Sequence, residues 1–390
     1  MRLQLKGRAL TSAAVALALG GGASVSSPAR ADWSGGAEGR TSIYQDTSRT
    51  TISTTVVNAR VSPSDRVTVS GHYLVDIISS ASVDVISSAT SKAQCSSMVP
   101  STTSTCQQQP FHETRHEGEA GITYADGTHT ASLGYVYSVE NDWRSHGFAG
   151  AYSNDYLNHR LTLGLGGSFT TNAVGRSHDE NFHRSQKQFS LSFDVGIVGS
   201  KRDLISLDYS LVYVTGFQAS PYRNAFFADS TVPGQVIGTP EVVPDLRIRH
   251  AVAVRWNHHL FHDTALKSHL RGYTDSWGVL SGTAGTEYVV GFRELELGVF
   301  ARGYAQNGAS FYQDTYTERR LYMTSDRKLS PMIDAFGGLR LAWQHNHRLG
   351  FIEELHAELK GSGFALKFFD FHRMPTQQGV IGELALGGSL

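Results

Sequence analysis

The sequence has few cysteines, little charge and no long apolar run, and each scarcity excludes a class of protein. Two cysteines among 390 residues are too few for a disulfide-stapled scaffold or an array of zinc fingers. Charged residues make up 18% of the chain, and 34 Lys and Arg against 35 Asp and Glu leave a net charge of -1. This balance excludes a nucleic-acid binder driven by bulk positive charge, and with 10% aromatic residues it excludes a disordered chain. After residue 31 there is no apolar run of about 18 residues, so no transmembrane helix is predicted.

Sequence motifs of enzymes are missing as well. The chain contains no G-x-S-x-G motif, no Walker loop and no zincin motif. It is rich in serine, so Ser and His pairs arise by chance and do not by themselves indicate a nucleophile. We therefore predict a protein that is not an enzyme and needs no cofactor, and we keep an outer-membrane hydrolase as the third of three hypotheses.

The N-terminus has the layout of a secretory signal peptide. Basic residues precede an apolar run over 9–19, and Ala29-Arg30-Ala31 has the small-x-small pattern of a cleavage site. The apolar run is too short to span a bilayer. The sequence thus predicts that residues 1–31 are removed and that residues 32–390 act beyond the inner membrane.

Apolar and polar residues alternate along most of the remaining chain. In 188–198, for example, the odd positions are Phe, Leu, Val or Ile, and the even positions up to Asp194 are Gln, Ser or Asp. A period of two is typical of β-strands and not of helices. The segment 351–360 also fits an amphipathic helix because of its glutamates. Such segments predict about sixteen strands, near 36–46, 50–61, 66–77, 114–124, 128–139, 145–154, 160–171, 187–199, 204–215, 249–259, 264–274, 280–291, 295–305, 332–343, 350–360 and 379–390.

Short and long connections alternate between these segments. Every second link is short, as at 62–65, 125–127 and 200–203, which a soluble β-sandwich does not require. Outer-membrane barrels have short periplasmic turns at one rim and longer extracellular loops at the other. We therefore predict an all-β fold, an antiparallel transmembrane β-barrel of about sixteen strands (roughly fourteen to eighteen) with both termini in the periplasm. The long loops are expected at 78–113, 172–186, 216–248, 306–331 and 361–378.

Aromatic residues near the predicted strand ends fit the belts that such barrels place at the two membrane–water interfaces. Ordinary enrichment of aromatics in strands is the alternative. The residues concerned are Trp143, Trp256, Trp277, Trp343, Tyr124, Tyr156 and Tyr273.

Several stretches resemble a family of exported bacterial proteins, a domain of unknown function predicted to form outer-membrane barrels. The most specific part is the segment from Asp76 to Asp84. The resemblance implies a barrel. Members are often encoded near a periplasmic flavin transferase, which implies an association with periplasmic redox proteins. The matching stretches are 43–46, 67–90 (VTVSGHYLVDIISSASVDVISSAT), 113–118, 220–223, Pro240 with Pro244, 249–251 and 323–330.

Cys95 and Cys106 lie in a Ser-, Thr- and Gln-rich segment, 91–110, which is not part of the family pattern and is interpreted as an inserted loop. In an oxidising compartment two such cysteines are expected to form a disulfide. Their spacing excludes a catalytic C-x-x-C pair.

Two histidines and two aspartates are weaker candidates for a site. His112 and His116 are spaced for metal binding on a helix, but on the expected strand they lie about 13 Å apart. From the end of the third strand onward, Asp76 and Asp84 belong to a serine-rich segment. Their carboxylates are expected either to pin a loop to the barrel wall or to line a constriction, with calcium binding and acid–base chemistry as alternatives.

Charged residues on one face of the predicted strands are expected to point into the lumen, because a charged side chain is costly against lipid. Opposite charges across a water-filled lumen would screen small polar solutes, whereas the same charges paired with one another would close it. The predicted pore-lining residues are Arg255, Lys267, His269, Arg271, Glu294, Glu296, Arg302, Arg340, Glu354, Glu358 and Lys360.

These patterns lead to two main hypotheses. In the first, the protein is a bacterial outer-membrane channel or transport component for small polar solutes. In the second, it is a non-enzymatic scaffold or sheath for periplasmic redox proteins that carry flavin or metal. Both predict contact with outer-membrane lipid and none with nucleic acid.

Overall fold

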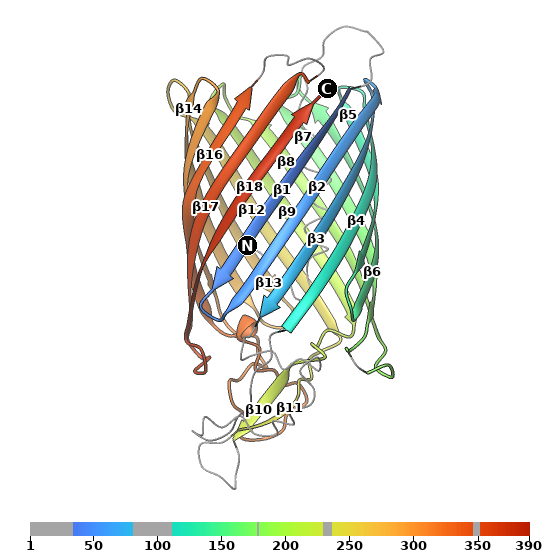
Figure 1. The fold of residues 1–390 in the computed structure, drawn as a ribbon, viewed down its shortest axis with the longest axis vertical. Helices are drawn as coiled ribbons and strands as arrows, with labels where there is room; N and C mark the ends of the chain where they lie inside the picture. Colours follow the sequence, from blue (N-terminus) through green and yellow to red (C-terminus); the bar gives the residue numbers. More distant parts are fainter. Residues whose placement is uncertain (1–33, 81–110, 178, 229–235, 346–351) are drawn as a thin grey trace.

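The computed structural model describes residues 34–80, 111–177, 179–228, 236–345 and 352–390, and within them sixteen strands close into one antiparallel barrel (Figure 1). The order around the ring follows the chain, except that β10 and β11 form a separate hairpin between β9 and β12. The barrel strands are β1 (Ser34–Asp46), β2 (Thr50–Ser64), β3 (Val67–Ser80), β4 (Phe111–Ala125), β5 (His129–Val139), β6 (Trp143–Tyr156), β7 (Leu161–Val174), β8 (Arg184–Val198), β9 (Asp203–Gly216), β12 (Leu246–His259), β13 (Thr264–Asp275), β14 (Leu280–Phe292), β15 (Leu295–Gln306), β16 (Met332–His345), β17 (Glu354–Phe368) and β18 (Thr376–Ser389).

The first and last strands complete the ring. β1 pairs with β18 from Gly36 opposite Ser389 to Asp46 opposite Gly379. The Leu390 N–H also donates to the Gly35 carbonyl at 2.8 Å. A closed ring leaves no unpaired strand edge, which is the condition for a sheet to cross a bilayer. The predicted barrel and its sixteen strands are confirmed.

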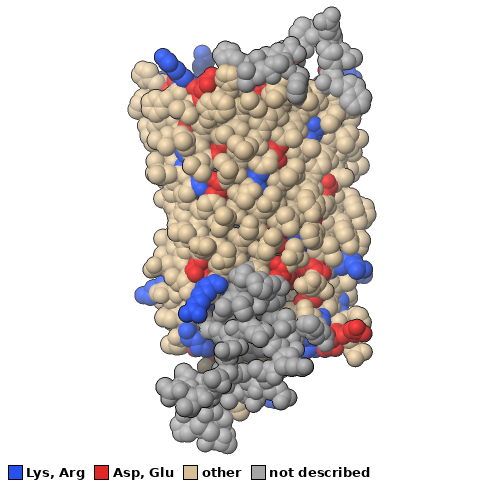
Figure 2. Space-filling model, viewed as in Figure 1, with Lys and Arg blue, Asp and Glu red and all other residues tan. Residues whose placement is uncertain are grey.

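Alternation along the strands separates an apolar outer face from a polar inner face. On β15, Leu295, Leu297 and Val299 are 45%, 42% and 50% exposed, and the intervening Glu296 points into the barrel. Figure 2 shows a face that is mostly uncharged, with the larger charged clusters toward its two ends. In the part of the chain that the structure describes, no helix is long and apolar enough to cross a membrane.

The links at the two ends of the barrel differ in length. One end has short turns, such as 126–128 and 293–294, and also carries both ends of the barrel chain; we call it the short-turn rim. Gly127 (φ 90°) and Arg293 (φ 54°) adopt the left-handed backbone conformation that tight hairpin turns require. The opposite end, which we call the long-loop rim, has the connections 217–245 and 307–331.

Strand β17 is longer than expected, and the amphipathic-helix alternative for this region is wrong. The segment 350–360 was expected to end before a long loop, 361–378, but β17 continues to Phe368 and the loop shrinks to 369–375. In this second half the usual pattern is inverted, because Phe364 and Leu366 are buried while Gly363 and Ala365 face outward. β17 stays paired with β16 and β18 through Gly361 and Gly363, although glycine has a low propensity for strands.

The two longest described loops fold together into a cap at the long-loop rim (Figure 1). The cap comprises β10 (Asn224–Ala228), β11 (Val236–Pro240) and the 3-10 turn η2 (Arg327–Leu329). Ala225, Tyr316 and Met323 form its buried apolar cluster. The sequence predicted these loops as long but did not predict the β10–β11 hairpin, because five-residue strands give little periodicity.

The aromatic belt is present at the short-turn rim but does not include every predicted residue. Tyr124, Tyr156 and Trp256 are 42%, 44% and 40% exposed near that rim. Trp277 is buried in the turn between β13 and β14, and Tyr273 belongs to the inner face, so both expectations are wrong. Tyr273 donates a hydrogen bond to Asp275, and the Trp277 ring packs against Arg247, so both residues contact the buried Arg247–Asp275 ion pair.

Some predicted features lie outside the described residues. They are the signal peptide at 1–31, the inserted loop 91–110 with Cys95 and Cys106, and Asp84.

Candidate functional site

The lumen carries a concentration of positive side chains on β12, β13 and β15. Alternation with the exposed Val252, Leu270 and Val299 places these cations on the inner face. We call this surface the basic wall; its residues are Arg249, Arg255, Lys267, His269, Arg271 and Arg302. All but Arg249 were predicted as pore-lining.

The strand register brings three of these side chains into one row. Arg255 pairs with His269, His269 with Gly285, and Gly285 with Arg302. A Cβ on Gly285 would lie 2.3 Å from the His269 ring, so the imidazole lies across this glycine toward Arg302. Any larger residue at 285 would displace the ring.

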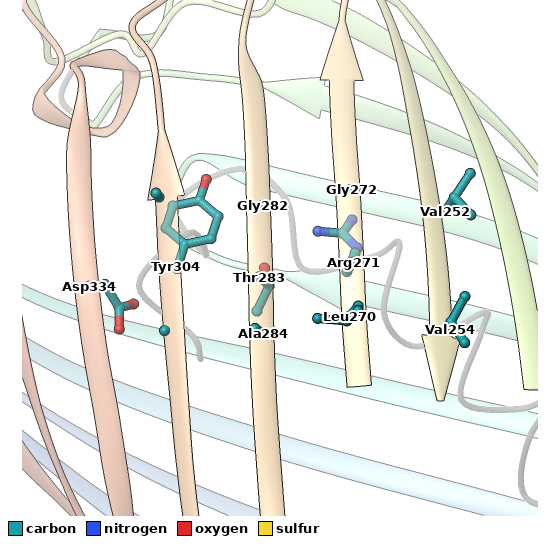
Figure 3. A pocket seen from close by; sticks show the side chains of 12 residues that line it. Val252, Val254, Leu270, Arg271, Gly272, Gly282, Thr283, Ala284, Tyr304 and Asp334 are labelled. Carbon is teal, nitrogen blue, oxygen red and sulfur yellow. The ribbon is translucent and has the colours of Figure 1, made fainter. Parts of the chain in front are cut away.

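The adjacent row mixes charge with hydroxyl groups. Arg271 pairs with Thr283, Thr283 with Tyr304, and Tyr304 with Asp334 on β16. Figure 3 shows these four side chains on neighbouring strands. The hollow drawn there opens on the outer surface, because Val252, Val254 and Leu270 in its lining face outward, whereas the four polar side chains have inward parity. The row therefore offers a cation, two hydroxyls and a carboxylate to a solute that passes along the wall.

The basic wall is only partly neutralised. Arg302 pairs with Asp334 at 2.5 Å and Arg255 with Asp208 at 3.3 Å, where the Arg255 side chain stays 44% exposed. Within the described residues, Arg249, Lys267 and Arg271 have no carboxylate within ion-pair distance. An excess of positive charge therefore faces the interior.

The opposite side of the lumen is acidic. β3 and β4 lie half a turn around the ring from β13 and β14. Their inward-facing carboxylates are Asp76, Glu113, Glu117 and Glu119; Arg115 on the same face pairs with Glu117. The two sides therefore set up a field across the lumen.

Asp76 lies within β3 rather than in a loop after it. Its carboxylate is buried and accepts a hydrogen bond from the Thr54 hydroxyl of β2. It therefore ties two strands of the wall together.

Near the short-turn rim the inward charges pair with one another. Arg340 contacts Glu287 at 2.9 Å, Glu358 at 3.5 Å and also Glu296. Arg40 of β1 contacts the same Glu358 at 3.4 Å. Lys360 lies 3.8 Å from Glu383. The predicted residues Glu296, Arg340, Glu358 and Lys360 thus belong to a mutually compensated network.

Two predicted pore-lining glutamates lie near the rim. Glu354 begins β17 and accepts a hydrogen bond from the Gln344 side chain at 2.5 Å. Glu294 differs from expectation because it lies in the turn before β15. There it accepts from Trp343 Nε1 at 3.2 Å and contacts His345 at 3.0 Å. Both partners lie on the outward face, so Glu294 serves the rim rather than the lumen.

The loop 307–331 packs on the inner wall at the other end of the lumen. Leu329 joins a buried cluster with Trp277 and Val279. The Arg327 guanidinium lies 5.8 Å from the centre of the inward-facing Phe368 ring. The Gln306 side chain of β15 donates to the Lys328 and Ser330 carbonyls at 3.0 and 2.7 Å. This loop therefore narrows the lumen at the long-loop rim.

A buried carboxylate joins the two loops of the cap. Glu241 accepts hydrogen bonds from the Ser220 N–H at 2.6 Å and the Thr324 hydroxyl at 2.7 Å. Arg223 pairs with Asp326 beside it at 2.5 Å. Burial raises the pKa of Glu241, Asp326 adds to the rise and Arg223 opposes it.

Because the pKa of Glu241 is higher in the folded cap, the cap should be more stable at low pH. That stability is fully present below the unfolded-state pKa of about 4.3 and is lost as the pH rises through the folded value. The test measures the rate of protease cleavage within 217–245 for the wild type and for Glu241→Gln at each pH. The ratio of the wild-type rate to the variant rate should rise with pH and then level off. A ratio that falls with pH would contradict this assignment.

Of the two histidines considered for a metal site, His116 is the one whose side chain the structure describes. His116 lies on the outward face of β4, where its Nδ1 is 2.8 Å from the Tyr73 hydroxyl, and His112 lies on the same strand. Oxygen atoms of Glu113, Glu140 and Asp142 lie within 4.8 Å of one another. Arg115 is 3.8 Å from Glu140, and the Tyr222 hydroxyl donates to Asp142. Both of these carboxylates therefore already have a protein partner.

Sequence reasoning missed some lumen residues that its own pattern contained. Arg249 shares the parity of Arg255 in the predicted strand 249–259, and Glu119 shares the parity of Glu117 in 114–124. The cap anchors Glu241 and Asp326 had no such signal, because irregular loops have no period.

An apolar exterior around a closed ring with charged groups inside defines a transmembrane β-barrel of the outer-membrane type. The chain belongs to the DUF3570 family, described as proteins of unknown function, whose model matches residues 7–388. The predicted resemblance is confirmed, although the association with flavin transferases stays a prediction. No curated protein matches the sequence.

Solved structures similar to this chain are also outer-membrane proteins. A bacterial polysaccharide outer membrane secretin is 11% identical, with 93% of this chain and all of that chain covered and a TM-score of 0.47. OccD3 (OpdP) of Pseudomonas aeruginosa is 9% identical, with 92% and 91% covered and a TM-score of 0.46. The siderophore receptor PirA of Pseudomonas aeruginosa is 8% identical, with 93% and 81% covered and a TM-score of 0.41.

Proposed function

We propose that the protein is an outer-membrane channel that passes small polar solutes, with a preference for anions. The observation that carries the proposal is the basic wall, in which Arg249, Lys267 and Arg271 face the lumen without a carboxylate partner among the described residues. If the lumen charges served only to stabilise the barrel through ion pairs, these cations would be expected to have carboxylate partners. By the rule for such barrels, the long-loop rim faces the outside of the cell and the short-turn rim the periplasm.

The arrangement of charge supports passage rather than a closed lumen. The compensated network lies near the short-turn rim, the loop 307–331 narrows the opposite end, and Arg271 lies between them. A solute that enters therefore meets positive charge on one side and carboxylates on the other. Such a field orients dipolar solutes and raises the local concentration of anions.

Single-channel recording of the purified protein in a planar bilayer tests the proposal. Stepwise conductance is expected, with a reversal potential in a salt gradient that indicates selectivity for chloride over potassium. A protein that inserts and migrates as a folded barrel but stays electrically silent would refute the channel. It would favour the second hypothesis, a scaffold for periplasmic redox proteins.

A further inference from the structure

The outward face of the barrel is asymmetric in charge. Near the long-loop rim, strand alternation places Arg144 of β6, Lys187 of β8 and Lys367 of β17 on the outer surface. Among the outward positions of the described strands, the one carboxylate is that of Asp203. It lies at the short-turn rim, where Trp256 and His258 bond it at 3.0 and 2.7 Å. The outward positions of the described strands therefore carry cations near the long-loop rim and one carboxylate near the other rim.

Three strands bring the outward cations together in one place. His146 of β6 pairs with Thr171 of β7, and Thr171 pairs with Lys187 of β8. Adjacent strands lie about 4.8 Å apart, so the two basic residues flank the threonine hydroxyl at roughly 10 Å from each other. Arg144 is the next outward residue of β6 toward the rim. We call Arg144, His146, Thr171 and Lys187 the cationic patch.

The cationic patch is available to a ligand. Among the described residues, neither Arg144 nor Lys187 has an ion-pair partner, and both are exposed. His146 Nδ1 lies 2.7 Å from the Tyr135 hydroxyl, which holds the ring and leaves Nε2 for another contact. In the neighbouring loop, Asp179 is already paired with Arg176 at 3.0 Å.

We propose that the cationic patch binds the phosphate-bearing headgroups of the lipid leaflet at the long-loop rim. Arg144 and Lys187 are the second and fourth residues of their strands, so they lie where the apolar surface ends and headgroups begin. Cations there would be costly against hydrocarbon but form charge-assisted hydrogen bonds with phosphate. Tyr135 beside them is an aromatic residue of the kind that favours this boundary. The inference does not depend on whether the lumen conducts.

The test measures lipid preference at the surface of the barrel. The full barrel is reconstituted in phosphatidylcholine bilayers, and the association of spin-labelled phosphatidic acid is compared with that of spin-labelled phosphatidylcholine. A basic residue near a membrane surface changes the affinity for an anionic lipid about fivefold. Wild type should therefore prefer phosphatidic acid severalfold, and Arg144→Gln with Lys187→Gln should remove most of that preference.

Lys367→Gln is the matched control, because it removes a cation from the same rim outside the patch and should keep most of the preference. A folded barrel in each variant is verified by its heat-dependent migration. If wild type shows no preference for phosphatidic acid, or if the double variant keeps it, the proposal is wrong. Equal losses in Lys367→Gln and the double variant would also overturn it, because the rim charge and not the patch would then bind the lipid.

Discussion

Charge reversal at Arg255 and Arg271 is expected to turn an anion-selective barrel into a cation-selective one. Both side chains are exposed to the lumen, and Arg271 has no ion-pair partner among the described residues. One unit charge about 4 Å from a permeating ion changes its energy by about 1 kcal/mol in water, or about fivefold in population. The neutral variant Arg255→Gln with Arg271→Gln should lower the anion preference, and the two glutamate substitutions should reverse it.

The reversal potential of each variant in a salt gradient gives the result directly. Lys367→Gln is the control, since it removes the same charge from the outward face and should leave selectivity unchanged. Conducting variants whose selectivity equals that of wild type would show that ions do not pass the basic wall.

Arg247→Ala is expected to cause the largest loss of stability of any single substitution proposed for this barrel. The Arg247 and Asp275 side chains are 1% and 0% exposed, and Arg247 Nε donates to Asp275 at 2.7 Å. Removing one partner of a buried pair leaves an uncompensated charge and costs about 3–5 kcal/mol. The guanidinium also lies 4.0 Å from the centre of the Trp277 ring, a contact that the truncation removes.

The free energy of unfolding in denaturant, measured on the protein folded into lipid vesicles, tests this expectation. Arg176→Ala provides the comparison, because its pair with Asp179 is about one third exposed on both sides. Such a surface pair should cost less than about 1 kcal/mol. Similar losses in the two variants would show that the Arg247–Asp275 pair is not buried in the folded protein.

Much of the barrel follows from local sequence. The alternation at 188–198 and 204–215 predicts β8 and β9 to within a few residues because side-chain direction in a strand depends on position alone. The same parity places Arg255, Lys267 and Arg271 on the face opposite their exposed apolar neighbours. The expected pattern of apolar residues outside and polar residues inside did not predict the second half of β17, where Phe364 and Leu366 face inward. Packing inside the barrel outweighed strand propensity there.

The sequence by itself determined the fold class, the strand count, the alternation of short and long links and the face on which most charged strand residues lie. All of these depend on a period of two and on loop length, which are local properties. Only the tertiary structure decided which charges meet. Arg340 lies 53 residues from Glu287 and Arg223 lies 103 residues from Asp326, and ring closure and loop packing bring each pair together. Whether an inward cation is neutralised or left facing the lumen depends on such long-range register, which no local pattern specifies.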